Sequence, residues 1–303
     1  MALVRGLVEC SLEPVDRLVI AHVHHHLRGP AADADAAWVE QLGSQLGIKV
    51  HVGHVDAGAA KAVRASGSRE AAARAARYEW LEAAAGDLGC SHLAVAHTAD
   101  DQAETILHHV VRGTGLDGLR GMPASRPLSD AVTLVRPLLE VTRGEVIAYL
   151  EHISQDSRHD ATNDDLGHTR NRIRHELLPL LEREFNPRVR EALVRLARQA
   201  ADVEAITAVA AETVLERAVL DETPDTIRLD AEWLMSQPRP LVRECLKRLW
   251  IRSGWPRGGL GFDDWERLAD TVCGGPPIAL AGRIDVRRRA NLVVISRQSP
   301  ADR

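Results

Sequence analysis

The 303-residue chain lacks the features that mark membrane, secreted and zinc-bound proteins. No uninterrupted apolar run approaches the roughly 18 residues that a membrane helix needs, and the amino terminus has no signal-peptide pattern. The four cysteines are scattered and form no Cys-x-x-Cys pair, which argues against a zinc site or a redox couple. We therefore expect a cytoplasmic protein that binds no membrane and whose cysteines are small buried side chains.

The chain also lacks an excess of positive charge and any internal repeat. A net charge of -5 argues against a broadly cationic surface that coats nucleic acid, although a local basic patch can still bind RNA. The hydrophobic content of 45% is typical of a folded globular protein, and the length suits one α/β core with a smaller second domain.

In the first half of the chain, apolar runs suited to strands alternate with helix-like segments. This alternation favours a parallel sheet with helices on both faces. Thr142-Arg-Gly-Glu145 has the spacing of a capping box and predicts a helix over 141–152. The other predicted strands are 17–23, 49–55 and 92–96, and the other predicted helices are 34–46, 68–86 and 100–111.

The pattern changes after Asn186-Pro187. Apolar residues recur at helical spacing from Val189 to about Leu220, which predicts one long helix or two abutting helices. A short strand at 226–229, helices at 241–251 and 263–272 and a hairpin within 278–295 should follow. We therefore divide the chain into segments 1–186, 187–220 and 221–303.

The most informative segment follows the predicted strand at 92–96. His97 stands at the end of that strand, and Asp101 and Glu104 are three residues apart at the start of the next helix, so they share a face. Ligands of parallel sheets gather beyond the carboxyl ends of the strands. Two carboxylates there could hold Mg²⁺ beside a triphosphate. Alternatively, Asp100 and Asp101 could do no more than favour the positive end of the helix dipole.

Three further groups have both a binding and a purely structural interpretation. Arg112 precedes Gly-Thr-Gly115 and either contacts phosphate or ends a helix. The run His22-Val-His24 leads to Arg28, and a loop over a nucleotide is a better explanation than a zinc site, because adjacent residues of an extended chain point to opposite faces. Arg74 shares a helix face with Tyr78 and is either a ligand contact or a solvated arginine.

Three arginines alternate with other residues between Thr169 and Glu176. In a helix, Arg170 and Arg174 would share one face and Arg172 would lie away from them. One face could then meet phosphate while the other meets carboxylates of the protein itself. An amphipathic helix with ordinary surface arginines is the alternative.

Taken in this order, the segments resemble the tRNA(Ile)-lysidine synthetases, which belong to the N-type ATP pyrophosphatase (PP-loop) group. The resemblance covers residues 1 to about 185 closely and the remainder more loosely. The matching pieces are Ala21-His-Val-His-His-His-Leu-Arg-Gly29, Ser68-Arg-Glu-Ala-Ala-Ala-Arg-Ala-Ala-Arg-Tyr78, His97-x-x-Asp-Asp-x-x-Glu-Thr105, Arg112-Gly-Thr-Gly115, Val135-Arg-Pro-Leu138 and Arg170-Asn-Arg-Ile-Arg-His-Glu-Leu-Leu-Pro179.

The resemblance implies a doubly wound, mostly parallel α/β sheet of the PP-loop ATPase type, similar to the adenine nucleotide alpha hydrolases. This catalytic domain would occupy 1–186, followed by a helical connector at 187–220 and a small α+β domain at 221–303 that binds tRNA or substrate. The implied reaction modifies the wobble cytidine in the CAU anticodon of tRNA(Ile). The C2 carbonyl oxygen attacks the α-phosphate of ATP and releases pyrophosphate, and the ε-amino group of free L-lysine then displaces AMP. Lysidine pairs with A instead of G.

The resemblance also implies cofactors, partners and residue roles. ATP and Mg²⁺ would take part, with Mg²⁺ beside Asp101, and association into a homodimer is compatible with the family. The catalytic residues would be His97, Asp101, Glu104 and Arg172. Contacts to ATP or substrate would come from His22, Val23, His24, Arg28, Arg74, Arg112 and Arg170. The residues that face tRNA would be Arg174, Arg287, Arg288 and Arg289.

One part of the family pattern is missing. The family carries a Ser-Gly-Gly-x-Asp-Ser loop between its first strand and first helix, whose backbone amides cradle the ATP phosphates, and this sequence has no such loop. Because the first ten residues look like the helix after the loop, we expect a start codon upstream of Met1 or a truncated gene. The neighbours of the missing strand should then be unpaired. An inactive fragment that binds tRNA and a related PP-loop tRNA thiolase are the alternative functions, and the lack of a cysteine pair argues against the thiolase.

Overall fold

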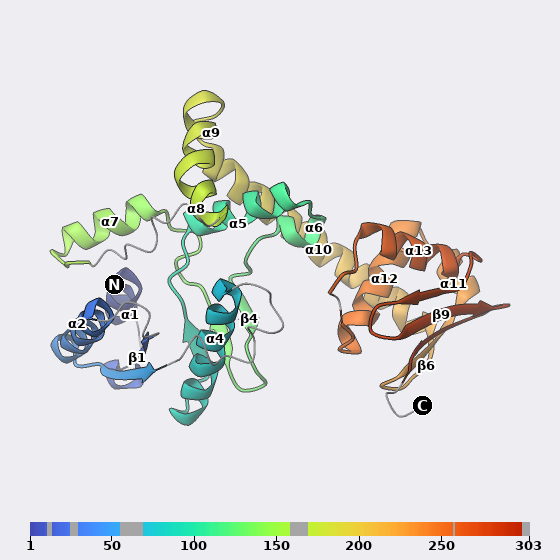
Figure 1. Ribbon diagram of the computed structural model, residues 1–303, viewed down its shortest axis with the longest axis horizontal. Coiled ribbons are helices and arrows are strands. Elements are labelled where there is room, and N and C mark those ends of the chain that lie inside the picture. Colours follow the sequence, from blue (N-terminus) through green and yellow to red (C-terminus); the bar gives the residue numbers. More distant parts are fainter. Residues whose placement is uncertain (11–13, 25–29, 55–68, 158–168, 257, 299–303) are drawn as a thin grey trace. The chain divides into compact units, whose positions relative to one another are not determined.

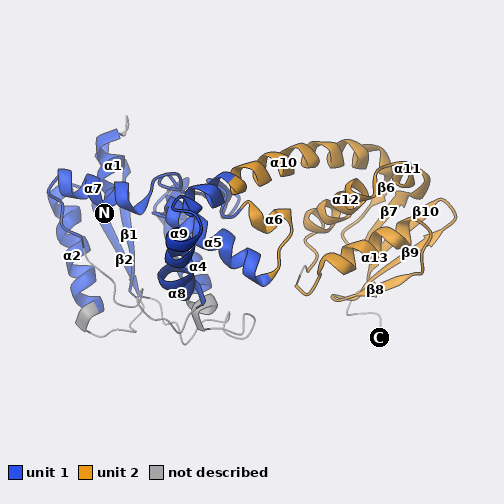
Figure 2. Cartoon of the chain, turned by 90° about the horizontal axis from the view of Figure 1, so that it is seen from above, with its two compact units in different colours: residues 1–112, 121–195 blue, residues 113–120, 196–303 orange. Residues whose placement is uncertain are grey.

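The computed structural model describes residues 1–10, 14–24, 30–54, 69–157, 169–256 and 258–298. These residues form two compact units, which Figure 2 shows in different colours. Unit 1 comprises residues 1–112 and 121–195, and unit 2 comprises residues 113–120 and 196–303. The boundary between Arg195 and Leu196 falls inside the helix Val189–Ala218, so the predicted connector at 187–220 is divided between the two units. The role of this segment as a separate connector stays a prediction.

Unit 1 begins with a strand, helix and strand in the predicted order. After α1 (Ala2–Cys10) and the short turn η1 (Val15–Arg17), strand β1 (Val19–His24) pairs in parallel with β2 (Lys49–His54), and α2 (Pro30–Leu46) connects them. Helix and strand approach closely at Gly43, where a Cβ atom would lie 2.1 Å from the side chain of Val50. A parallel pair needs a crossover of this kind, so the local sequence and the topology agree.

A second sheet carries the residues of the predicted site. Helix α4 (Arg69–Asp87) precedes β3 (His92–Ala94), which pairs in parallel with β5 (Thr133–Val135), while β4 (Ser125–Pro127) adds an antiparallel strand to β5. Among the described strands, β1 pairs with β2 alone and β3 with β5 alone. The mostly parallel α/β architecture is confirmed, and the described strands of unit 1 form two sheets (Figure 1).

Two helices of unit 1 begin as the sequence predicts. Helix α5 (Ala99–Arg112) has Asp100 and Asp101 in its first turn, where negative charge stabilises the helix dipole. Helix α7 (Arg143–His152) has the predicted capping box, in which Thr142 accepts a hydrogen bond from the Glu145 amide and the Glu145 side chain accepts one from the Thr142 amide.

The arginine-rich segment forms one helical run with a widened turn. Helix α8 (Thr169–Arg172) continues through the π-helical turn η3 (Ile173–Leu177) into α9 (Leu178–Glu184). Pro179, in the first turn of α9, has no N–H to donate to the preceding turn, and the π-helical turn ends just before it. The run packs against α5 through Leu107, Ile173 and Leu178, which are all buried. The arginines are thereby fixed beside the start of α5.

Unit 2 has its own sheet and core. Helix α10 (Val189–Ala218) is the predicted single long helix, and most of it belongs to this unit. The antiparallel sheet has the order β6-β7-β10-β9-β8, and its core centres on Trp250, which contacts Trp255 and Trp265 edge-on. The elements are α6 (Leu116–Leu119), β6 (Val219–Glu222), β7 (Thr226–Asp230), α11 (Ala231–Met235), α12 (Arg239–Arg252), α13 (Phe262–Val272), β8 (Ile278–Leu280), β9 (Ile284–Arg289) and β10 (Leu292–Arg297).

The predicted strand, helices and hairpin of the last segment are confirmed, while β6 was not predicted. Helices long and apolar enough to cross a membrane are absent from the described residues.

Candidate active site

A cavity of about 720 Å³ lies in unit 1 beyond the carboxyl end of β3. The residues that follow β3, from Val95 to Thr98, line one part of it, and the first turns of α5 line another. Arg77 and Tyr78 of α4 contribute, as do Arg143, Arg174, His175 and Arg190 from elements later in the chain. The cavity therefore lies where parallel sheets collect their ligands.

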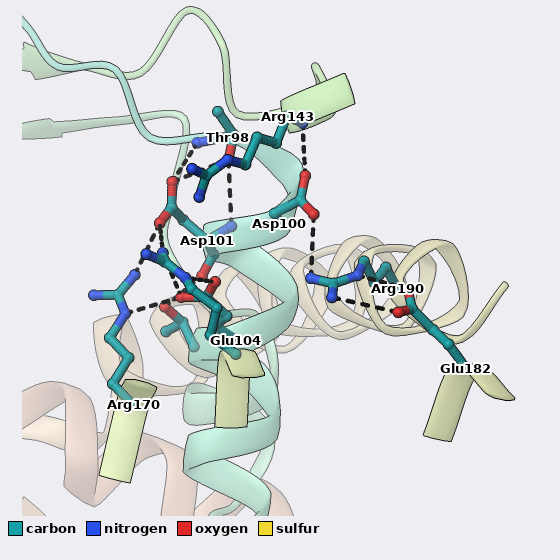
Figure 3. A network of polar contacts seen from close by, with 10 residues as sticks. Thr98, Asp100, Asp101, Glu104, Arg143, Arg170, Glu182 and Arg190 are labelled. Atoms are coloured by element: carbon teal, nitrogen blue, oxygen red, sulfur yellow. Dashed lines mark hydrogen bonds and ion pairs between the residues drawn. The ribbon is translucent and has the colours of Figure 1, made fainter. Parts of the chain in front are cut away.

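Four charged side chains, which we call the carboxylate–arginine cluster, meet at this cavity: Asp101, Glu104, Arg170 and Arg174. The Glu104 side chain is 1% exposed. Its Oε1 accepts a hydrogen bond from Arg174 Nε at 2.5 Å, and its Oε2 accepts from Arg170 Nε at 3.2 Å. Two negative and two positive charges are thereby balanced at a partly buried position (Figure 3).

Asp101 is held from two sides within the cluster. Its Oδ2 accepts hydrogen bonds from the Thr98 amide at 2.9 Å and the Thr98 hydroxyl at 3.0 Å, which fixes the carboxylate at the helix start. Its Oδ1 accepts from Arg174 Nη2 at 3.0 Å and from Arg170 Nη2 at 3.3 Å. Burial opposes the charge of Arg174, but its hydrogen bonds and attraction to Glu104 outweigh that effect and raise the pKa of Arg174.

Asp100 ties three helices together beside the cluster. Its Oδ2 accepts the Arg143 amide of α7 at 2.7 Å, and its Oδ1 accepts from Arg190 Nη1 of α10 at 3.1 Å. Arg190 Nε also donates to Glu182 Oε1 at 2.6 Å (Figure 3). Neither Arg143 nor Arg190 was predicted to have a role at this site, because no local spacing relates them to Asp100.

His97 is the third feature of the cavity. Its Nδ1 accepts a hydrogen bond from Arg136 Nε at 3.3 Å. Burial lowers the pKa of His97 to about 4; the charge of Asp101 opposes this shift, and the guanidinium groups of Arg136, Arg74 and Arg170 add to it. The imidazole is therefore neutral at neutral pH.

Comparisons with known proteins identify the family of the chain. Residues 1–181 match the PP-loop domain family. The tRNA(Ile)-lysidine synthase of Rhodopirellula baltica is 35% identical over 283 residues, which cover 87% of this chain and 70% of that protein. The enzyme of the same name from Geobacter sulfurreducens is 35% identical, covering 98% of this chain and 63% of that protein. The chain belongs to the tRNA(Ile)-lysidine synthase family.

Further relatives show how much of the known proteins this chain covers. The tRNA(Ile)-lysidine synthase of Porphyromonas gingivalis strain W83 is 44% identical over 178 residues, 58% of this chain and 38% of that protein. The chain thus spans between 38% and 70% of the length of these three relatives. The solved U34-tRNA thiolase NcsA from Methanococcus maripaludis, with its [4Fe-4S] cluster, has a TM-score of 0.52 at 18% identity, covering 65% of this chain and 67% of that one. This last likeness concerns the fold alone.

The structure brings together four of the residues that the family resemblance assigned to catalysis or ligand binding. His97, Asp101 and Glu104 line the cavity, and Arg170 bonds both carboxylates. Arg174 lies in the cluster with its donors on Asp101 and Glu104, and its predicted contact with tRNA stays a prediction.

Other predicted residues lie elsewhere in unit 1. Arg172 has a side chain 64% exposed and pairs with Glu176 at 3.4 Å, so its catalytic role stays a prediction. Arg74 and Arg112 are exposed on α4 and at the end of α5. Arg74 lies 5.7 Å from the centre of the Tyr78 ring, on the face it was predicted to share.

The first part of the predicted histidine loop, from His22 to His24, forms the end of a strand. His22, Val23 and His24 belong to β1, and the buried His24 ring lies 3.1 Å from Asp33 Oδ1. Arg28 lies outside the described residues. The predicted ATP contacts of this segment stay predictions.

The three arginines of β9 that were predicted to face tRNA differ in their surroundings. Arg287 lies 3.7 Å from Asp285, and Arg289 is exposed. Arg288 donates to the carbonyl oxygens of Val272 at 2.9 Å and Ala290 at 2.8 Å, which stabilises unit 2 from within. Their contact with tRNA stays a prediction, and Arg288 has a structural role already.

The residues at Asp101 do not fit a directly bound Mg²⁺. Each of its oxygens already accepts hydrogen bonds, from Thr98 on one side and from two guanidinium groups on the other. No group of three or more metal-ligating side chains occurs among the described residues. Mg²⁺ in ATP sites is bound by one or two carboxylates together with substrate phosphates and water, so a carboxylate with both oxygens engaged gives no support to the predicted magnesium ligand at Asp101.

Proposed function

We propose that this protein ligates free lysine to C2 of the wobble cytidine in the CAU anticodon of tRNA(Ile), at the expense of ATP. The modified anticodon would read AUA as isoleucine instead of AUG as methionine. The observation that carries the proposal is the carboxylate–arginine cluster, which shares its cavity with His97 in a chain of the lysidine synthase family.

The first step would be adenylation of the cytidine. Its C2 carbonyl oxygen attacks the α-phosphorus of ATP, and the bond from that phosphorus to pyrophosphate breaks. Negative charge gathers on the phosphoryl oxygens as the bonds change. Arg77, Arg143 and Arg190 line the cavity and supply guanidinium groups of the kind that bind phosphate.

The second step would be attack of lysine on the activated base. The ε-ammonium group must first lose a proton to water or to a carboxylate of the cavity. Its nitrogen then forms the C2–N bond while the C2–O bond breaks, so AMP leaves with the former carbonyl oxygen of the base. An ammonium group is attracted to carboxylates, and Asp100, Asp101 and Glu104 line the same cavity as the arginines. We assign lysine binding to this edge of the cavity, where the ammonium group would replace an arginine at one of these carboxylates.

We propose that Mg²⁺ is bound by the ATP phosphates. Neither of the two steps then depends on a metal ion held by the protein. A cytoplasmic location and a homodimer are further parts of the proposal, and sedimentation equilibrium of the full chain measures the second. A mass of one chain at all concentrations would refute the dimer.

The test is incorporation of labelled lysine into a tRNA(Ile) transcript with a CAU anticodon, followed together with pyrophosphate release. We expect incorporation that needs ATP and is absent from a transcript with G in place of the wobble C. The same assay is run with Glu104→Gln, which changes the cavity and should reduce lysine incorporation. Glu176→Gln is its matched control, because Glu176 pairs with Arg172 and does not line the cavity.

Each alternative function predicts a different outcome. Transcript binding without lysine incorporation or pyrophosphate release would favour a tRNA-binding fragment and refute the ligase. Incorporation of sulfur would favour a thiolase. The cysteines were expected to be buried, which is confirmed for Cys245 in unit 2 and is wrong for Cys10 and Cys273, which are exposed.

A further inference from the structure

Arg136 and His97 meet because their strands are neighbours. In the parallel pair of β3 and β5, Ala94 lies opposite Val135, and the Val95 amide donates to the Val135 carbonyl oxygen. Arg136 directly follows Val135, and His97 lies three residues beyond Ala94. Both chains leave the sheet at the same edge, so the two side chains reach the same part of the cavity.

The guanidinium of Arg136 is fixed and buried. Arg136 is only 5% exposed, and its Nη1 donates to the Pro123 carbonyl oxygen at 2.7 Å. Its own amide donates to the Ala124 carbonyl oxygen at 2.8 Å. The side chain is therefore held at both ends, which leaves Nε–H directed at His97 Nδ1.

The chemistry of arginine decides which ring nitrogen of His97 carries the proton. A guanidinium stays protonated in proteins and has no acceptor, so its Nε–H can only donate. The nitrogen that accepts this bond, Nδ1, must be unprotonated. The proton of the neutral ring is therefore on Nε2. Among the described residues, the hydrogen bond from Arg136 is the one hydrogen bond of the His97 ring. The Nε2–H group is therefore left for a ligand.

The surrounding charges favour the same state. Asp101 of α5 attracts a proton to His97, while Arg136 after β5, Arg74 of α4 and Arg170 of α8 repel it. Burial opposes a charged ring as well, and together these effects lower the pKa of His97 to about 4.

We propose that Arg136 is a positioning residue that holds His97 as its neutral Nε2–H tautomer, so that His97 donates a hydrogen bond to the substrate and does not accept its proton. The acceptor is an oxygen of the nucleotide substrate, on phosphate or on the base carbonyl. This second part rests on the proposed function, whereas the tautomer does not.

The tautomer is measured directly by nitrogen NMR of the full chain labelled at its histidines, with His97 assigned from the signal that His97→Gln removes. We expect an unprotonated Nδ1 and a protonated Nε2 from about pH 5.5 to 8. A proton on Nδ1, or titration of the ring near its ordinary pKa of about 6.5, would overturn the proposal. This measurement needs no substrate and no activity.

Arg136→Met and Arg126→Met form a matched pair for the same spectrum. Arg126 is half-buried and lies 5.7 Å from the Tyr78 ring, but it does not bond His97. We expect Arg136→Met to give a mixture of tautomers and a higher pKa of His97, and Arg126→Met to leave the tautomer unchanged. Equal effects of the two substitutions would show that general charge, and not the Arg136 bond, holds the ring.

Two substitutions of His97 separate donation from proton acceptance in the lysine incorporation assay. Glutamine keeps an N–H donor and has no basic nitrogen, whereas alanine has neither. We expect His97→Gln to keep activity within about tenfold and His97→Ala to lose about 100-fold, as for other oriented donors. Equal losses would overturn the donor role. Absence of lysine incorporation in the unmodified chain would instead refute the proposed function and leave the NMR result standing.

Discussion

Replacing Glu104 by glutamine is the sharpest test of the carboxylate–arginine cluster. The substitution keeps the shape of the side chain and removes one of two negative charges, so Arg170 and Arg174 would share Asp101 alone. Breaking a buried ion pair costs about 3–5 kcal/mol. Because the two arginine side chains are 28% and 19% exposed, water offsets part of this cost, and we expect a loss of about 2–3 kcal/mol.

The measurement is thermal unfolding of the full chain by circular dichroism. For a unit of this size, 1 kcal/mol shifts Tm by about 2–4 °C, so Glu104→Gln should lower Tm by about 4–12 °C. Glu176→Gln, whose side chain is 53% exposed and pairs with Arg172, should shift Tm by less than about 2 °C.

A double substitution tests the reason for the loss. If the unpaired buried charge causes it, Glu104→Gln combined with Arg174→Met should be more stable than Glu104→Gln alone. Equal decreases in Tm for Glu104→Gln and Glu176→Gln would refute the reasoning, because the burial of Glu104 would then add nothing to the loss of stability.

Three further predictions test other parts of the molecule. Thr142→Ala should destabilise unit 1 by about 1 kcal/mol in urea unfolding through loss of the α7 capping box, and Thr142→Ser should not; equal losses would contradict the capping role. Burial, with Glu244 and Glu212 nearby, raises the pKa of Cys245 to about 12. Iodoacetamide at about pH 8 should therefore modify Cys10 and Cys273 in the folded protein, and Cys245 only after unfolding. A similar rate of modification at Cys10 and Cys245 would contradict this. The pKa of His97, about 4 when folded against 6.5 when unfolded, means that the unfolded chain takes up this proton first as the pH falls. Stability should therefore decline between about pH 6.5 and 4, and His97→Gln should reduce that decline; an unchanged profile would show that His97 does not contribute.

Much of the local structure was predictable because each segment carries its own signal. The capping box of Thr142 and Glu145 marks the start of α7, and the apolar spacing after Val189 predicts the single helix α10. The shared helix face of Arg170 and Arg174 follows from their spacing alone. The six motifs from Ala21 to Pro179, taken together and in order, were sufficient to identify the family that the comparisons then showed.

The partners of these residues were less predictable. Helical spacing does not say what faces Arg174, so it was assigned to tRNA although it lies against Glu104. Arg190 lies 90 residues from Asp100, and no local pattern connects them. Arg136 matched a family motif, but its burial and its bond to His97 depend on how β3 and β5 pair.

The amino-acid sequence by itself determined most of the helices and strands, the family and the segment that carries the acidic residues, because short-range spacing and capping depend on neighbours along the chain. Only the tertiary structure decided that Arg170 and Arg174 neutralise Asp101 and Glu104, and that Arg136 orients His97. The strength of a charge interaction depends on distance and burial, and both are set by the packing of segments far apart in the sequence.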